Sequence, residues 1–166
     1  MIEALKNIGV DAEELEIYQA INSFPGSGRR FEKLVENLYS DYGHHPVEIQ
    51  ATLQMAKELS NDVVLVYQPH QNVRQHEIIG QYTNDIFRDA NEIYWLPTYL
   101  TRENPDLPTL TPQQLAKNID KEKVHFAELD DSLWQEVTAA RNSGKLVLCM
   151  GAGTIDGWIR EQLAKN

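Results

Sequence analysis

The stretch DVVLVYQ, at positions 62–68, decides how this sequence folds. It places five apolar residues in a row, and three of them are valines, whose branched side chains favour extended backbone. A continuous apolar run of this length is typical of a strand buried on both faces, which occurs mainly in parallel sheets covered by helices. The run KLVLCM at 145–150 predicts a second such strand, which ends in the glycine turn GAG.

Strands and helices alternate around these two runs from residue 36 onward. The expected strands are 31–36, 37–42, 62–68, 92–96, 124–129 and 145–150, and the expected helices are 45–60, 76–89, 111–119, 130–144 and 154–166. In the helix over 45–60, we expect Ile49, Leu53, Met55 and Ala56 to face the core. The alternation predicts an α/β fold with a three-layer, doubly wound, mostly parallel sheet of the Rossmann-like kind.

The turn PGSG at 25–28 predicts a domain boundary. Residues 1–26 are expected to form two helices followed by a hinge, and residues 27–166 the α/β domain. The Asp11 and Glu14 pair has the spacing of a capping box at the start of the second helix. The total length of 166 residues fits one domain of ordinary size with a short leading segment.

Composition and charge exclude several kinds of protein. The net charge of −10 and the lack of a run of Lys and Arg argue against a nucleic-acid partner, which needs a basic surface. No apolar stretch approaches the ~18 residues of a membrane span, and the N-terminus does not read as a signal peptide, so we expect a cytoplasmic protein with no membrane partner. The one cysteine, Cys149, indicates a reducing compartment and is expected to be a core residue rather than a nucleophile.

Polar clusters follow three of the expected strands, at the point where each strand ends. They are SDYGHHP at 40–46, QPHQNVR at 68–74 and GAGT at 151–154. In doubly wound sheets ligands bind beyond the carboxyl ends of the strands, so we expect these clusters to meet at one edge. A histidine before a helix can donate to a carboxylate or phosphate, and Arg74 can hold a carboxylate with both guanidinium arms.

Each cluster also has a purely structural interpretation. Asp41 and one histidine would then cap a helix, and the loop with His70 and Arg74 would be an ordinary polar loop. Adjacent histidines rarely bind one ion together and no zinc spacing is present, so no metal site is expected. The turn GAG, followed by Thr154, is only half of a dinucleotide fingerprint and favours close backbone packing or a helix N-terminus facing a ligand.

A fourth cluster, GSGRRF at 26–31, places two arginines after a flexible turn. The arginines could reach phosphates across a domain cleft, or the segment could be a surface hinge without a ligand. The sequence contains neither the GxxxxGK[ST] phosphate loop nor the GxSxG elbow of hydrolases. This chain alone therefore has no Walker-type nucleotide site.

Taken together, the four clusters resemble the Mur ligases of peptidoglycan synthesis, most closely the branch that joins L-alanine to UDP-N-acetylmuramate. The segments that carry the resemblance are SFPGSGRRFE (23–32), SDYGHHPVEIQATL (40–53), VVLVYQPHQNVRQ (63–75) and VLCMGAGTI (147–155). The resemblance covers the C-terminal, amino-acid-binding domain at 27–166, with residues 1–26 similar to the last helices of the central ATPase domain. The phosphate loop would then lie upstream of this chain.

The resemblance implies an ATP-dependent ligase that forms an amide bond through an acyl phosphate. Arg30 would reach the ATP phosphates, and Asp41 would hold the nucleotide from this side, next to His45. Tyr42, His44 and His45 would line the junction of nucleotide and amino acid as substrate-side residues, and His70 and Arg74 would bind the incoming amino acid, with Arg74 at its carboxylate. Mg²⁺ and UDP-N-acetylmuramate would be held mainly by the other domains, and this chain by itself would be inactive.

Two positions depart from the family pattern. Gln71 stands where relatives usually have an arginine, and Thr154 where they tend to have an acid. One cation fewer near the amino-acid carboxylate leaves open an altered amino-acid preference, and also the sister group that ligates a recycled tripeptide. The same residues are compatible with a Rossmann-like module that binds a small anion without catalysis, and with a structural domain that binds no ligand.

Overall fold

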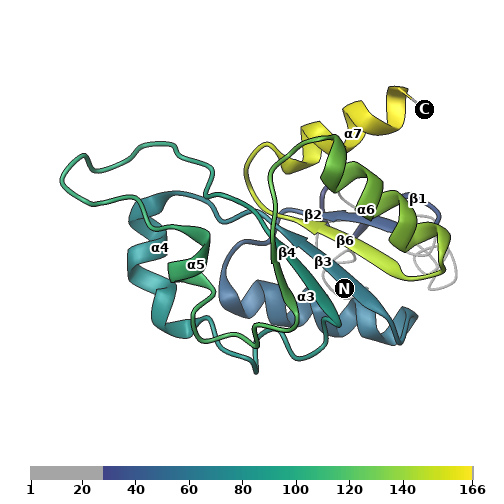
Figure 1. Cartoon of the computed structure of the whole chain (residues 1–166), viewed down its shortest axis with the longest axis horizontal. Helices are drawn as coiled ribbons and strands as arrows, with labels where there is room; N and C mark the ends of the chain where they lie inside the picture. The colour runs from purple at the N-terminus through teal and green to yellow at the C-terminus, as the bar shows by residue number, and fades with distance from the viewer. Residues whose placement is uncertain (1–27, 166) are drawn as a thin grey trace, which may run out of the picture.

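The computed structural model describes residues 28–165 (Figure 1). The expected helices over 1–24 and the boundary at 26/27 lie outside the described residues. The strands are β1 (Glu32–Val35), β2 (Leu38–Asp41), β3 (Val63–Tyr67), β4 (Glu92–Trp95), β5 (Val124–Phe126) and β6 (Leu146–Met150). The helices are α3 (Pro46–Leu59), α4 (Asn72–Ile78), the 3₁₀ turn η1 (Ile79–Gln81), α5 (Pro112–Leu115), α6 (Asp131–Asn142) and α7 (Ile155–Lys165).

The strands form one sheet in the order β1-β2-β6-β3-β4-β5. Every neighbouring pair is parallel except β1 and β2, which form an antiparallel hairpin at one edge. Helices α6 and α7 cover one face, and α3, α4 and α5 cover the other (Figure 1). The predicted three-layer, mostly parallel α/β fold is confirmed.

Strand β3 is the centre of the core, as its sequence predicts. All five of its residues are buried. Val63, Leu65 and Tyr67 belong to the cluster under α3, whereas Val64 and Val66 belong to the cluster under α6 and α7. Because alternate residues of a strand point to opposite faces, one continuous apolar run supplies both halves of the core.

The predicted helix over 76–89 is wrong in both its start and its end. Helix α4 begins at Asn72, because the carboxylate of Glu103 accepts hydrogen bonds from the N–H groups of Asn72 and Val73 and thus caps the first turn. It ends at Ile78, and after η1 the chain turns so that the rings of Tyr82 and Phe87 pack against Trp95. The free energy gained by burying these rings outweighs the preference of the segment for a helix, which its apolar periodicity suggested.

Met55 is the one residue of the predicted α3 core that is misplaced, since it is 48% exposed. Ile49, Leu53 and Ala56 are buried and recur at the i, i+4, i+7 spacing of one helix face, which Met55 does not share. Helix α5 is also shorter than predicted. Thr111 caps its start by accepting a hydrogen bond from the Gln114 N–H, but the helix ends at Leu115.

We predict that Leu53→Ala lowers the free energy of unfolding by about 2–4 kcal/mol, because truncating a fully buried leucine leaves a cavity. Met55→Ala, two positions away on the same helix, is the matched control. Its expected change is below about 0.5 kcal/mol. Urea unfolding followed by circular dichroism measures both variants, and equal losses would contradict the assignment of the buried face.

Candidate active-site rim

The three polar clusters meet because β2, β6 and β3 are neighbours in the sheet. Met150, the last residue of β6, pairs with Asp41 on one side and with Tyr67 on the other. The chain leaves the sheet beside these positions, so the loops after the strands share one edge. We call this edge the rim, and it comprises residues 41–45, 68–71, 98–99 and 151–154.

A row of aromatic rings runs along the rim. The centroids of the Tyr42 and His44 rings are 5.7 Å apart, and those of His44 and His70 are 5.4 Å apart. The ring of His70 stacks on Tyr99 at 5.7 Å with an interplanar angle of 13°. Two histidines that are far apart in the sequence are thus in contact, as the strand-end argument predicts.

Tyr99 is a rim residue that the sequence analysis missed. Its backbone N–H donates to the Pro69 carbonyl, and its carbonyl accepts from the Gln71 N–H. These bonds form an isolated parallel bridge between His70 and Tyr99. The available signal was positional: β4 is the neighbour of β3, so the loop after β4 reaches the same edge.

A buried hydrogen-bond chain connects the two histidine loops. The Tyr67 hydroxyl lies 3.0 Å from the His44 carbonyl oxygen and 2.9 Å from the Tyr82 hydroxyl. The Tyr82 hydroxyl donates to Gln75 Oε1, and Gln75 Nε2 donates to the His70 carbonyl. Burial raises the pKa of both tyrosines, so their hydroxyls remain protonated donors. The chain therefore fixes the backbone of His44 relative to that of His70.

The buried carboxylate of Asp41 holds two parts of the rim region together. Its side chain accepts a hydrogen bond from the N–H of Phe31 at 2.7 Å and another from the N–H of Gly43 at 2.7 Å. The residue is only 6% exposed. It thereby holds the start of the β1 hairpin and the turn before His44 together. A side chain at Gly43 would meet this carboxylate and Met150, so the backbone approaches them closely at this position.

The two arginines of GSGRRF take different positions. Arg29 is half-buried, and its Nη2 donates to the Gly151 carbonyl at 2.8 Å. Arg30 is exposed, and its guanidinium carbon lies 5.5 Å from the centroid of the Tyr42 ring. Within residues 28–165, Arg30 forms no ion pair. It places a positive charge at the end of the ring row.

Among residues 28–165, neither His45 nor Arg74 forms a ring or cation–ring contact with the ring row. His45 is the N-cap of α3, and its N–H, like that of His44, donates to Glu48 Oε2 at 3.0 Å. Although partial burial opposes ionisation of Glu48, these two bonds hold the pKa of its carboxyl below 4.5. Arg74 lies one turn into α4 and pairs with Glu77 on the helix surface.

The GAG turn packs tightly against the loop after β3, which supports the packing interpretation. A Cβ on Gly151 would lie 2.6 Å from the Gln68 carbonyl oxygen, and one on Gly153 would lie 2.6 Å from Tyr99 Cβ. The Gln68 side chain accepts from the Ile155 N–H and donates to Thr154 Oγ1, so it caps α7. The helix N-terminus is therefore filled by a protein side chain.

His70 is the histidine whose proton affinity the rim changes. Partial burial and then the neighbouring His44 lower the pKa of His70 below its ordinary 6.5. The neutral imidazole is favoured at neutral pH, so one ring nitrogen is able to accept a hydrogen bond. Cys149, by contrast, is buried in β6 as expected, and burial raises the pKa of its thiol to about 12.

Residues 28–165 hold no group of three or more His, Cys, Asp or Glu side chains placed to bind a metal. None of the described helices has both the length and the apolar character needed to cross a membrane.

Comparison with known families and sequences gives consistent matches. The family profile "Mur ligase, glutamate ligase domain" matches residues 29–153. A UDP-N-acetylmuramate–L-alanine ligase of Rickettsia massiliae is 35% identical over 158 residues, covering 87% of this chain and 32% of the relative. The corresponding protein of Rickettsia felis is 34% identical over 158 residues. The chain thus spans 32% of the length of these relatives.

Solved structures show the same fold. A murein peptide ligase of Psychrobacter arcticus aligns with a TM-score of 0.60 at 20% identity, over 98% of this chain and 34% of that chain. A bifunctional folylpolyglutamate synthase/dihydrofolate synthase of Yersinia pestis, complexed with AMPPNP and a Mn ion, aligns with a TM-score of 0.66 at 14% identity, over 93% and 35%. At these identities the likeness concerns the fold.

We predict that Tyr82→Phe lowers the free energy of unfolding by about 1–2 kcal/mol, because it leaves Gln75 Oε1 buried without its donor. Tyr39→Phe is the control, since its hydroxyl bonds to no residue within 28–165 and its ring packs on Phe31. Urea unfolding of both variants measures the difference. An unchanged stability in Tyr82→Phe would show that the buried chain does not bind the two loops together.

We predict that His44→Gln raises the pKa of His70 towards 6.5 but not fully, because burial remains when the neighbouring charge is removed. Titration of the His70 ring by NMR measures the pKa, with His125→Gln on β5 as a control that leaves it unchanged. The depressed pKa also means that wild-type stability falls as pH drops through 6.5 towards the folded-state pKa. That loss is expected to shrink in His44→Gln.

Proposed function

The chain belongs to the Mur ligase family, and from that membership we propose that it is the amino-acid-binding C-terminal domain of an ATP-dependent UDP-N-acetylmuramate–L-alanine ligase. Relatives with that name are 35% identical, which favours this branch over the others. Since the chain spans 32% of their length, the phosphate loop and the UDP-sugar site belong to the rest of the enzyme. The proposed location is the cytoplasm, where peptidoglycan precursors are made.

The single observation that carries this proposal is the ring row on the rim. The row connects Arg30, which forms no ion pair within residues 28–165, with the contact between His44 and His70. All of these residues lie at the carboxyl end of the parallel strands. The buried hydrogen-bond chain beneath it holds this geometry before any ligand arrives. Such preorganisation is what positioning two substrates for acyl transfer requires.

The residues near β1 and β2 suit the nucleotide side of the reaction. Arg30 is exposed and has no ion pair among the described residues, so it can bind a phosphate oxygen without losing a carboxylate partner. Each oxygen of Asp41 accepts one backbone N–H and has a second lone pair, which can accept a ribose hydroxyl. His45, at the start of α3, would face the charge that develops next to them.

The residues near α4 suit the amino acid. Arg74 would bind its carboxylate, exchanging the exposed partner Glu77 for the ligand at little cost, because exposed ion pairs contribute at most about 1 kcal/mol. A neutral His70 can accept a hydrogen bond from the incoming amine and so orient it. Tyr42, His44 and Tyr99 would wall the place where the amine approaches the activated carboxylate.

ATP would supply the phosphoryl group that activates the sugar-linked carboxylate as an acyl phosphate. The exposed guanidinium of Arg30 near the Tyr42 ring fits a polyphosphate. The Yersinia pestis neighbour was solved with an ATP analogue and a manganese ion. Following the family resemblance, Mg²⁺ would be bound mainly by the remainder of the enzyme. This chain's own residues bind, orient and exclude water.

The test is an assay of the full-length enzyme with ATP and UDP-N-acetylmuramate. We predict formation of phosphate and of an amide with L-alanine. Arg74→Ala is expected to raise the KM for L-alanine about tenfold or more and to change the KM for ATP less than about twofold, because it removes a contact to the amino acid alone. Arg88→Ala is the matched control: Arg88 is also exposed and also pairs three positions away, with Asp85.

Different results would identify a different function. Preference for the tripeptide L-alanyl-γ-D-glutamyl-meso-diaminopimelate over L-alanine would place the enzyme in the recycling group, which the replacement at Gln71 leaves open. Binding of amino acids without any amide formation would support a non-catalytic anion-binding module. An equal effect of Arg74→Ala on both KM values would contradict the assigned role of Arg74.

A further inference from the structure

Strand β5 forms an open edge of the sheet on the side opposite β1. It pairs with β4 in parallel, and the N–H of Ile93 donates to the Lys123 carbonyl while the N–H of Ala127 donates to the Trp95 carbonyl. Because alternate residues of a parallel strand bond to the same neighbour, the peptide groups of Val124 and Phe126 face outward. No strand among residues 28–165 pairs with them.

The side chains at this edge do not protect it. Edge strands are commonly guarded by a lysine that points outward, but Lys123 turns inward and donates to the Ala90 carbonyl at 3.0 Å. Phe126 is instead 48% exposed, which is unusual for a phenylalanine in a strand. The edge thus combines unpaired backbone groups with an uncovered aromatic ring.

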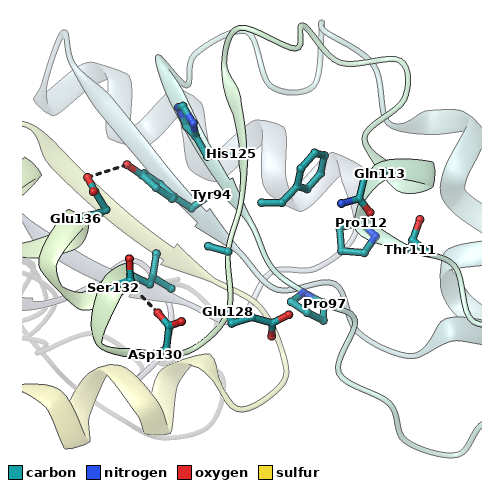
Figure 2. A pocket seen from close by; sticks show the side chains of 13 residues that line it. Tyr94, Pro97, Thr111, Pro112, Gln113, His125, Glu128, Asp130, Ser132 and Glu136 are labelled. Atoms are coloured by element: carbon teal, nitrogen blue, oxygen red, sulfur yellow. Dashed lines mark hydrogen bonds between the residues drawn. The ribbon is translucent and has the colours of Figure 1, made fainter.

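A groove follows the edge on both faces of the sheet. A cavity of about 780 Å³ is lined on the α6 side by Tyr94, His125 and Glu136 and near α5 by Gln113 (Figure 2). Phe126 also lines it. A second cavity of about 380 Å³ shares Gln113 and Phe126. Successive residues of a strand point to opposite faces, so a groove lined by both His125 and Phe126 wraps around the strand.

The two sides of the groove differ in chemistry. The α6 side carries the carboxylates of Glu128, Asp130 and Glu136, and none of them forms an ion pair with a described Lys or Arg. Figure 2 shows Glu136 hydrogen-bonded to the Tyr94 hydroxyl across this side. The α5 side is lined by the apolar residues Ala116, Ile119 and Val124, and its charged lining residues, Lys117 and Lys121, are cationic rather than acidic.

We propose that the outer edge of β5 binds an extended segment of a partner polypeptide as an added strand, with basic side chains on the α6 side and apolar side chains on the α5 side. The backbone of Val124 and Phe126 supplies the main-chain hydrogen bonds, and the two cavities take alternate side chains of the segment, which is how strand addition achieves specificity. The proposal does not depend on the ligase activity, because the groove contains none of the rim residues 41–45, 68–71, 98–99 and 151–154.

A second copy of this chain is a poorer occupant of the edge. When two copies pair through antiparallel edge strands about a two-fold axis normal to the sheet, the same faces lie side by side. Glu128, Asp130 and Glu136 of both copies would then be neighbours, and each chain also carries a net charge of −10. Charge complementarity therefore favours a basic partner segment.

The test uses this chain and a labelled hexapeptide of alternating Lys and Val with blocked ends, at about 0.15 M salt. Fluorescence anisotropy is expected to give saturable binding. A hexapeptide with the same composition in the block order Lys-Lys-Lys-Val-Val-Val, and an alternating peptide N-methylated on every second residue, are expected to bind about tenfold or more weakly, because one loses the alternation and the other the backbone donors.

Protein variants locate the site. Phe126→Ser is expected to weaken binding about tenfold, whereas Met55→Ser, at a side chain that is also 48% exposed, leaves it unchanged. Glu136→Gln is expected to weaken it about threefold or more by removing a charge from the α6 side. In the unmodified chain, amide hydrogen exchange of Val124 and Phe126 is expected to slow when the peptide is bound.

Equal binding of the alternating and block peptides, or unchanged exchange at Val124 and Phe126, would overturn the proposal and leave only attraction between opposite net charges. Concentration-dependent dimerisation in sedimentation, abolished by Phe126→Ser and not by Met55→Ser, would overturn it in favour of a second copy. The exchange measurement needs no variant, so the proposal remains testable if a substitution impairs folding.

Discussion

The rim depends on one buried constraint, the hydrogen-bond chain that runs from the His44 carbonyl through Tyr67, Tyr82 and Gln75 to the His70 carbonyl. The Tyr67 hydroxyl lies within hydrogen-bond distance of both the His44 carbonyl and the Tyr82 hydroxyl, so one side chain ties the His44 loop to the rest of the chain. Polar groups inside a core are costly unless paired, and therefore the core cannot rearrange without carrying both histidine loops with it. The packed core thereby fixes the distance between the His44 and His70 loops at the surface.

The sheet could be predicted from the sequence because its strands are encoded locally. Buried β-branched runs such as Val63–Tyr67 have few alternatives to a parallel strand, and the order of elements then limits the topology. The start of α4 could not be predicted, since its cap is Glu103, 31 positions from Asn72. The exposure of Met55 could have been predicted, because Ile49, Leu53 and Ala56 already define the buried face of α3.

The candidate site was predictable in its location but only partly in its composition. The ends of β2, β3 and β6 indicate where His44 and His70 lie, and their contact follows from the strand order. Tyr99 was missed because the signal used was a polar cluster directly after a strand, and β4 is followed by Leu96 and Pro97, with the polar stretch TRENPD starting only at 101. The roles proposed for Arg30, Asp41, His45 and Arg74 rest on side-chain chemistry and not on strand order.

The long loop between β4 and α5 is hydrogen-bonded to the start of α4 on either side of its tip. Glu103 caps α4, and the Asn72 side chain bonds to the Pro108 carbonyl and to the Leu110 N–H. Residues 104–106 between these anchors are exposed and project from the body of the domain (Figure 1). Lengthening such a tip adds little closure entropy, so this is where the domain can accept inserted sequence or a fluorescent reporter while the rim stays as it is.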